Sequence, residues 1–258
     1  MAFLHCRMRS NELKKAVEVN VVYPTASGAP EKVLYLLHGL SDDASIWSRR
    51  TSVERYAEKR NVAVIMPDGG RGFYTDALHG ARYWSYVAEE LPELVHGIFK
   101  LPEARKDTFV AGLSMGGYGA LKLGLRHPER FAAAGALSAV ADVRRRLRAP
   151  DTEAWRTELR LIFGGVKRLA ADGNDLFALA EDAVGSGKKL PRIISFCGTE
   201  DRLLQDNRRF AAHLERLGYP EFHAYERPGA HTWAHTWEFW DAHIAEVLDF
   251  FVSGALPE

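Results

Sequence analysis

Apolar residues along the chain alternate between two spacings, one typical of buried strands and the other of helices packed on one side. Nearly continuous apolar runs, expected of strands covered on both faces, occupy residues 32–37 (KVLYLL), 61–67 (NVAVIMP), 108–113, 131–137, 192–197 (RIISFC) and 222–225. Helical spacing is found at residues 51–60, 118–125, 207–217 and 237–251. Strands that alternate with helices predict an α/β fold with a mostly parallel central sheet and helices on both faces.

Some segments depart from this alternation. Residues 2–8 and 17–23 read as two antiparallel strands, and a helix over 83–99 contains Pro92, which should kink or break it. Residues 141–189 are charged, helical in character and longer than a crossover needs. This short helical insertion is expected over the strand ends, either as a small lid that shapes a pocket or as a surface excursion without a functional role.

The composition is that of a globular protein with a sizeable core. The 258 residues are 47% hydrophobic, and Lys+Arg and Asp+Glu balance at 34 each. Since no repeat or low-complexity linker interrupts the chain, residues 1–258 are predicted to form a single domain. The charge balance argues against a nucleic-acid partner or an acidic membrane surface, and the basic run at 144–146 reads as a solvated helix face.

Membrane association and secretion are not indicated either. No apolar run approaches the length of a membrane span, and the N-terminal residues have no apolar signal core. The two cysteines, Cys6 and Cys197, fall in apolar strand-like segments. Free buried thiols in a reducing compartment are the simplest interpretation, which predicts a cytoplasmic protein with no membrane partner.

Residues 108–118 (TFVAGLSMGGY) carry the strongest chemical signal. A β-rich run enters G-x-S-x-G and a helix follows, which is the strand–turn–helix context of a nucleophile elbow. Gly112 and Gly116 remove side chains that would crowd the tight turn, and Gly117 lets the helix approach the sheet. The alternative is a glycine-rich turn with an incidental serine, but partners downstream favour Ser114 as a nucleophile.

A serine hydroxyl needs a base to accept its proton and an acid to orient that base, in the chain order serine, acid, histidine for this kind of elbow. Glu200 and Asp201 both come directly after the predicted buried strand at 192–197. Either carboxylate is well placed to hold an imidazole, and capping of a following helix is the structural alternative for Asp201.

Two histidines are candidates for the catalytic base. His231 follows the last strand through a Pro-Gly turn. His235 comes four residues later, and the tripeptide HTW occurs at both positions. We favour His231 because it keeps the strand-to-histidine loop short. The other histidine is then a packed or hydrogen-bonded residue at the start of the final helix.

The same stretch permits a metal site as a rival. His231, His235 and Glu238 share one face of a helix and could ligate zinc. The metalloprotease pattern requires a glutamate directly after the first histidine, however, and Thr232 is found there. A complete serine site without metal is therefore the favoured reading.

Attack on a carbonyl places negative charge on oxygen, which two main-chain N–H groups should meet. One would be that of Met115, directly after the nucleophile at a helix N-terminus. The other should come from the loop after the strand at 32–37, with Leu40 N–H as the best candidate. His38, in the same loop, is expected to have a structural role.

Taken in order, LLHGLSDDASIW, MPDGGRGFYTD, AEELPELV, AGLSMGGYGALKL, CGTEDRLL and PGAHTW resemble the esterase D group of α/β-hydrolases, and the tributyrin esterase family within it most closely. The resemblance runs nearly end to end. It implies an α/β-hydrolase fold and a serine carboxylesterase that hydrolyses short-chain acyl esters without a cofactor or metal. It places Ser114, Asp201 and His231 on the triad positions, and Leu40 and Met115 on the oxyanion-hole positions.

The repeated tripeptide HTW departs from the family pattern, which has one histidine in this region. The position relative to the final helix matches the family's histidine to His235, whereas the distance along the chain from Asp201 matches it to His231. Either histidine can therefore be the catalytic base. The wider group also includes S-formylglutathione hydrolases, feruloyl and acetyl-xylan esterases and mycolyl acyltransferases, which leaves the natural substrate open. The implied partner is a small-molecule ester, and relatives that self-associate make a homo-oligomer a further expectation.

Overall fold

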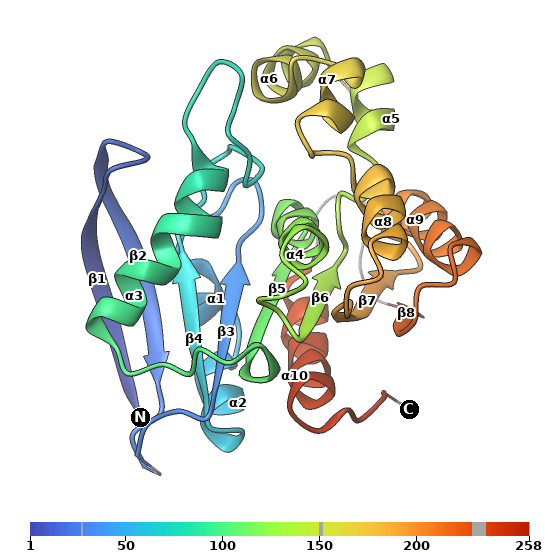
Figure 1. Cartoon of the computed structure of the whole chain (residues 1–258). Helices are drawn as coiled ribbons and strands as arrows, with labels where there is room; N and C mark the ends of the chain where they lie inside the picture. The colour runs from blue at the N-terminus through green and yellow to red at the C-terminus, as the bar shows by residue number, and fades with distance from the viewer. Residues whose placement is uncertain (27, 150–151, 229–235, 258) are drawn as a thin grey trace.

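The computed structural model describes residues 1–26, 28–149, 152–228 and 236–257, which form a sheet flanked by helices (Figure 1). Its strands are β1 (Ala2–Ser10), β2 (Lys15–Tyr23), β3 (Lys32–Leu37), β4 (Val62–Pro67), β5 (Thr108–Leu113), β6 (Ala133–Leu137), β7 (Arg192–Gly198) and β8 (Phe222–Arg227). Within these ranges they make one sheet in the order β1-β2-β4-β3-β5-β6-β7-β8. β1 with β2, and β2 with β4, pair antiparallel, and every pair from β4 to β8 is parallel. The predicted α/β architecture with a mostly parallel sheet is confirmed.

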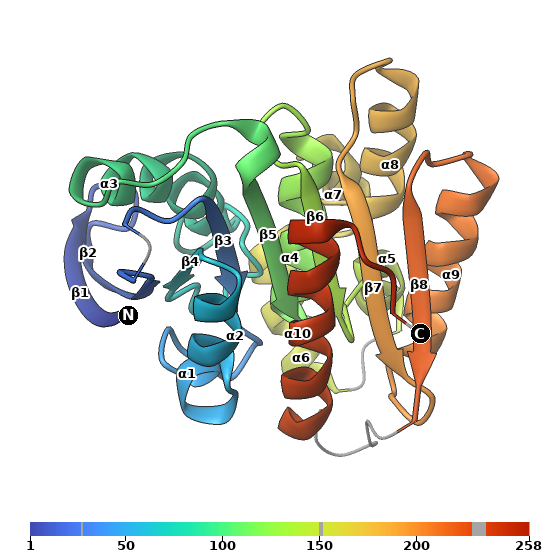
Figure 2. The same ribbon diagram turned by 90° about the horizontal axis from the view of Figure 1, so that it is seen from below.

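Helices cover both faces of the sheet (Figure 2). One apolar layer joins the sheet to α1 (Ile46–Arg50), α2 (Val53–Lys59) and α10 (Trp237–Ser253). The opposite layer joins it to η1 (Ser85–Glu90), α3 (Leu91–Ile98), α4 (Met115–Arg126), α8 (Leu176–Gly185) and α9 (Leu204–Arg216). A short turn, η2 (Arg105–Asp107), precedes β5. Among the described helices, none combines the length and apolar character needed to cross a bilayer.

The helix is not broken at Pro92: it is continuous over residues 83–98, and its winding changes just before the proline. The chain winds as a π-helix in η1 and changes to an α-helix at Leu91. Because proline has no N–H, the carbonyl of Ala88 receives no helical bond from Pro92. It accepts a hydrogen bond from Arg130 Nη1 instead, at 2.5 Å.

The insertion predicted at 141–189 contains α5 (Val143–Arg148), α6 (Glu153–Phe163), α7 (Val166–Ala171) and α8. α5, α6 and α7 rise above the carboxyl ends of the parallel strands (Figure 1), whereas α8 packs against α4 on one face of the sheet. Phe163 and Leu169 are buried in the main core, and the N–H of Leu78 donates to Ile162 O at 2.9 Å. The buried side chains anchor the insertion in the core, and the hydrogen bond joins it to the loop after β4, so the insertion forms a packed roof at this end of the sheet.

The basic run at 144–146 is solvated only in part: Arg145 is exposed and Arg144 half-exposed, but Arg146 departs from the prediction. Arg146 is only 5% exposed, and its guanidinium donates to the buried carboxylate of Asp206 from Nε at 2.9 Å and from Nη2 at 2.7 Å. Arg145 and Arg209 contact the same carboxylate. Because Asp206 lies on α9 and two of these arginines on α5, the network fastens the insertion to the body of the domain.

Asp206→Asn is expected to lower the free energy of unfolding by about 3 kcal/mol, because one partner of a buried ion-pair network is removed. Glu215→Gln on the same helix α9 is a matched control, since Glu215 is exposed and surface changes stay within about 0.5 kcal/mol. Urea unfolding of both variants measures the difference. Equal stability of the two variants would contradict the role given to Asp206.

Candidate active site

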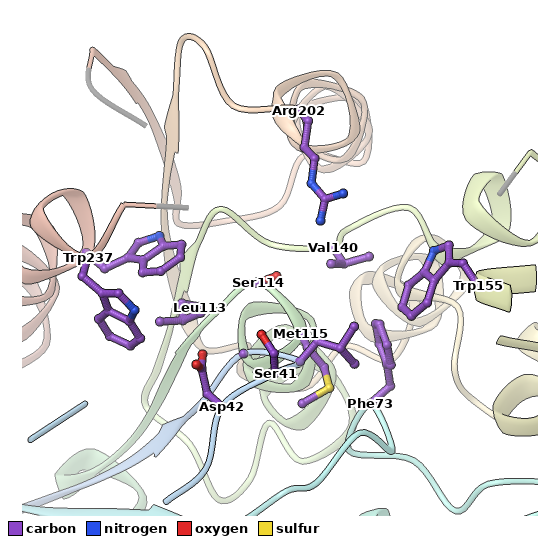
Figure 3. Close-up of a pocket in the computed structure, with 13 residues that line it drawn as sticks. Ser41, Asp42, Phe73, Leu113, Ser114, Met115, Val140, Trp155, Arg202 and Trp237 are labelled. Atoms are coloured by element: carbon purple, nitrogen blue, oxygen red, sulfur yellow. The ribbon is translucent and has the colours of Figure 1, made fainter. Parts of the chain in front are cut away.

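Ser114 lies between β5 and α4 in a strained conformation, as a nucleophile elbow requires. Its φ of 54° is in the left-handed region, which costs a non-glycine residue on the order of 1–3 kcal/mol. Its N–H donates to Leu137 O at 2.8 Å, and its carbonyl accepts from Val140 N–H at 3.1 Å. These bonds to the end of β6 and the loop beyond it hold the turn. The Ser114 side chain lines a cavity of about 360 Å³ (Figure 3).

The glycines of the elbow are sterically required. A Cβ at Gly112 would lie 2.4 Å from the carbonyl oxygen of Gly116, and a Cβ at Gly116 would lie 2.3 Å from that of Leu37. Main-chain atoms cannot move aside without disrupting the strands. The predicted strand–turn–helix geometry around Ser114 is therefore confirmed, and so is the reason for its glycines.

The two predicted oxyanion-hole residues lie at the same cavity as Ser114. Leu40 follows β3 and Met115 begins α4, and both line the cavity. At the first residue of a helix the N–H has no acceptor within the helix, and the helix dipole favours negative charge there. The main chain of Met115 is thus suited to stabilise an anion next to Ser114.

The peptide between Gly39 and Leu40 is held by its carbonyl. His38 Nδ1 lies 2.6 Å from Gly39 O, and Asp42 N–H donates to the same oxygen at 3.3 Å. Because His38 Nε2 accepts from Gly69 N–H at 2.8 Å, Nδ1 carries the proton and donates it to Gly39 O. In a trans peptide the N–H points opposite to the carbonyl, so these bonds fix the direction of Leu40 N–H. The structural role predicted for His38 is confirmed.

The acid candidates differ in their surroundings. Asp201 is only 6% exposed at the end of β7, and its Oδ1 accepts from Leu203 N–H at 2.8 Å. Glu200 is exposed. A buried, oriented carboxylate is better suited to hold an imidazole than a solvated one, which favours Asp201, as the sequence predicted.

His231 and His235, the candidate bases, lie outside the described residues. The chain that carries them leaves β8 at Arg227, which pairs with Gly198 in the neighbouring strand. Thr199 N–H also donates to Arg227 O at 2.9 Å. The histidine-bearing loop therefore begins beside the loop that carries Asp201.

Asp201→Asn is expected to lower kcat for ester hydrolysis by about 10⁴-fold, because an amide cannot orient and stabilise a charged imidazole as a carboxylate does. Glu200→Gln, one residue away, should retain activity within about twofold, because surface side chains away from the reacting atoms contribute little. Steady-state kinetics on p-nitrophenyl butyrate compares the two. A large loss in Glu200→Gln with little loss in Asp201→Asn would reverse the assignment.

The walls of the cavity include residues that the sequence analysis did not assign to the site. Trp155 from α6 and Phe73 from the loop after β4 lie side by side in one wall, with tilted rings whose centroids are 5.9 Å apart. Trp237 at the start of α10 packs edge-on to Trp47, with ring centroids 5.4 Å apart, and also lines the cavity. Further lining comes from Gly39, Ser41, Asp42, Leu113, Val140, Arg202 and Trp240.

No local motif identifies these wall residues. Trp155 lies on an amphipathic helix of the insertion, a pattern that equally describes a core residue. Asp42 is flanked by polar residues, and only the structure places its carboxyl at the cavity, where burial raises its pKa. Long-range packing, which the sequence does not encode locally, brings these residues together.

The zinc alternative is not decided by the structure. It depends on His231 and His235, which lie outside the described residues; Glu238 lies in the first turn of α10. In the part of the chain that the structure describes, no group of three His, Cys, Asp or Glu side chains could hold a metal ion. The zinc site stays a hypothesis that metal analysis can test.

Known proteins resemble the chain over nearly its full length. A family model described as "Putative esterase" matches residues 10–251. An acetyl esterase of Caldicellulosiruptor saccharolyticus is 29% identical over 265 residues, which cover 97% of this chain and 98% of that protein. The substrate-bound structure of fluorophosphonate-binding serine hydrolase F of Staphylococcus aureus is similar with a TM-score of 0.87, at 32% identity over 98% of each chain. The S-formylglutathione hydrolase of Staphylococcus aureus is similar with a TM-score of 0.84, at 32% identity over 98% of this chain and 99% of that one.

Proposed function

Because the chain belongs to this esterase family, we propose that it hydrolyses short-chain acyl esters through an acyl intermediate on Ser114. That it is a carboxylic ester hydrolase follows from the family and from its serine hydrolase relatives. The observation that carries the proposal is the strained turn at Ser114, which opens into a cavity shared with Leu40 and Met115.

The chemistry divides into acylation and deacylation. The imidazole of His231 takes the Ser114 proton as the oxygen attacks the ester carbonyl, and Asp201 orients and stabilises the resulting imidazolium. The N–H groups of Leu40 and Met115 donate to the tetrahedral oxyanion. The imidazolium then protonates the departing alcohol. Water, deprotonated by the same imidazole, attacks the acyl-serine and releases the carboxylic acid and the free Ser114 hydroxyl.

The size of the cavity supports a small acyl group. About 360 Å³ is near the lower end of ligand pockets, which span roughly 300–1,000 Å³. Phe73 and Trp155 form an aromatic wall, and Phe73 is itself fixed by edge-on contacts to Tyr118 and Phe163, with ring centroids 5.8 and 5.6 Å apart. A packed wall of this kind limits the length of the acyl chain rather than adapting to it.

A thioesterase of the S-formylglutathione type is the second candidate. The similarity to the Staphylococcus aureus enzyme of that name, at 32% identity over nearly the whole chain, favours it. Formyl and acetyl groups both fit a small acyl pocket, and the same acyl-serine steps cleave an ester or a thioester. The two candidates differ in the leaving group, a simple alcohol or glutathione.

The test combines labelling with a substrate panel. A fluorophosphonate should attach to Ser114, located by mass spectrometry of the digested protein, and should abolish hydrolysis. p-Nitrophenyl acetate and butyrate should be hydrolysed faster than the octanoate, and S-formylglutathione is assayed beside them. Labelling elsewhere, or full activity after labelling, would exclude the serine mechanism. A kcat/KM for S-formylglutathione far above that for the esters would select the thioesterase.

A further inference from the structure

Lys122 is completely buried in the helix that follows the nucleophile, and the mechanism above gives it no role. It is 0% exposed on α4. Its ammonium donates to Tyr74 O at 3.0 Å, to Thr75 Oγ1 at 2.9 Å and to Asn174 Oδ1 at 2.6 Å. The Nζ atom also lies 4.5 Å from the centroid of the Trp84 ring. Three acceptors match the three donors of an ammonium, so this geometry favours the charged form although burial lowers the pKa of Lys122.

The turn that Lys122 holds is strained. Phe73 and Tyr74 are consecutive non-glycine residues with φ of 50° and 46°, and both are buried. Each costs on the order of 1–3 kcal/mol in this conformation, which persists only where the surroundings enforce it. The Thr75 hydroxyl accepts from Lys122 and donates to Phe73 O at 3.0 Å, so Lys122 is linked to both strained residues.

Each strained residue contacts part of the active site. The ring of Phe73 forms the cavity wall beside Trp155 (Figure 3). The hydroxyl of Tyr74 donates to His38 O at 3.0 Å, in the loop that carries Leu40 N–H. A change in this turn would therefore alter both the acyl wall and the support of the oxyanion loop.

The third acceptor extends the link to the roof. Asn174 belongs to the insertion, two residues before α8, and its main-chain carbonyl oxygen accepts from Tyr118 OH at 2.7 Å. Lys122 thus joins the nucleophile helix, the strained turn and the insertion. The insertion also supplies Trp155, the aromatic ring that packs beside Phe73 in the same cavity wall.

We propose that Lys122 is a positioning residue that sets acyl-chain selectivity by holding the strained turn of Phe73 and Tyr74 against the cavity. It acts through Phe73, which excludes long acyl chains, and through Tyr74, which supports the oxyanion loop. The proposal rests on the ester hydrolysis proposed above. Its substrate class is esters of short-chain carboxylic acids, with the upper length limited by Phe73.

The test measures acyl-chain selectivity, with each rate expressed per competent active site. Lys122→Met keeps the length of the side chain and removes its charge and donors. The concentration of competent sites is counted with a fluorophosphonate, and kcat/KM is measured for p-nitrophenyl acetate and octanoate. We expect the octanoate-to-acetate ratio to rise about tenfold, the range that one or two methylene groups are worth in a pocket. A merely structural lysine would reduce the number of active sites and leave this ratio unchanged.

A double-mutant cycle identifies the route of the effect. Phe73→Ala should raise the same ratio, and Lys122→Met combined with Phe73→Ala should raise it no further than Phe73→Ala alone, because both changes act through one wall. Lys167→Met is the matched control, since Lys167 is an exposed lysine of the insertion, and it should keep the wild-type ratio. Additive effects of Lys122→Met and Phe73→Ala would overturn the proposal, as would an unchanged ratio in Lys122→Met.

Two further measurements separate this proposal from the proposed function. If wild-type protein fails to hydrolyse any ester in a Ser114-dependent way, the function fails first. A crystal structure of Lys122→Met still tests the positioning role, because Phe73 should leave the left-handed conformation. An unchanged turn would overturn the role. If Lys122→Met does not fold, Thr75→Val, which removes one acceptor at nearly constant volume, should shift the ratio in the same direction by about threefold.

Discussion

Ser114→Ala is expected to lower kcat for p-nitrophenyl butyrate by about 10⁶-fold without unfolding the protein. Removal of a nucleophile abolishes the acyl-enzyme route and leaves only the catalysis that binding and the oxyanion hole supply. Alanine retains the Cβ and adds no strain beyond that which Ser114 already has at φ 54°. Stopped-flow and steady-state kinetics measure the loss of kcat, and thermal unfolding confirms that the variant is folded.

Ser41→Ala is the matched control, since Ser41 is an exposed serine at the same cavity. It should retain activity within about threefold, because it neither attacks the substrate nor lies in the turn. Full activity in Ser114→Ala would contradict the serine mechanism. The zinc hypothesis for His231 and His235 would then come next, and metal analysis with chelator treatment would test it.

Local sequence was sufficient for the parts of the site that depend on local geometry. The spacing of Gly112, Ser114 and Gly116 predicts a turn in which both glycines meet main-chain atoms, and the distances of 2.4 and 2.3 Å agree. The strand order brings Leu40, Met115 and Asp201 to one edge because the carboxyl ends of parallel strands coincide. The elements before and after each residue were enough to place it at this edge, although the choice of Asp201 over Glu200 came from the family resemblance.

Long-range contacts were beyond local reasoning. The run of charged residues that contains Arg146 predicted an exposed side chain. In the structure Arg146 is buried, and its guanidinium pairs with the carboxylate of Asp206, 60 residues later. The sequence assigns no role to Lys122, whose acceptors come from the loop after β4 and from the insertion. Nothing within ten residues of either side chain indicates its partners. The aromatic wall of Phe73 and Trp155 likewise depends on how the insertion folds back on the sheet.

The second large effect concerns the base. His231→Ala is expected to lower kcat by about 10⁶-fold, comparable to the loss of the nucleophile, because the two residues act as one unit. Adding Ser114→Ala to His231→Ala should therefore cause little further loss. His235→Ala is the natural control, since it removes an imidazole four residues away, and it should retain activity within about threefold if its histidine only packs or donates a hydrogen bond.

The pH dependence of kcat/KM tests the assignment of His231 as the base independently. A histidine base must be neutral to accept the Ser114 proton, so kcat/KM should rise with pH as the imidazole loses its proton and level off once it is neutral. His235→Ala should keep this profile, whereas the residual activity of His231→Ala should lose it. Collapse of activity in His235→Ala, with His231→Ala close to wild type, would move the base to His235 and leave Ser114 and Asp201 in place. Comparable losses in both variants would mean that one imidazole is the base and the other is required to hold it, and addition of free imidazole would then restore activity only in the variant that lacks the base.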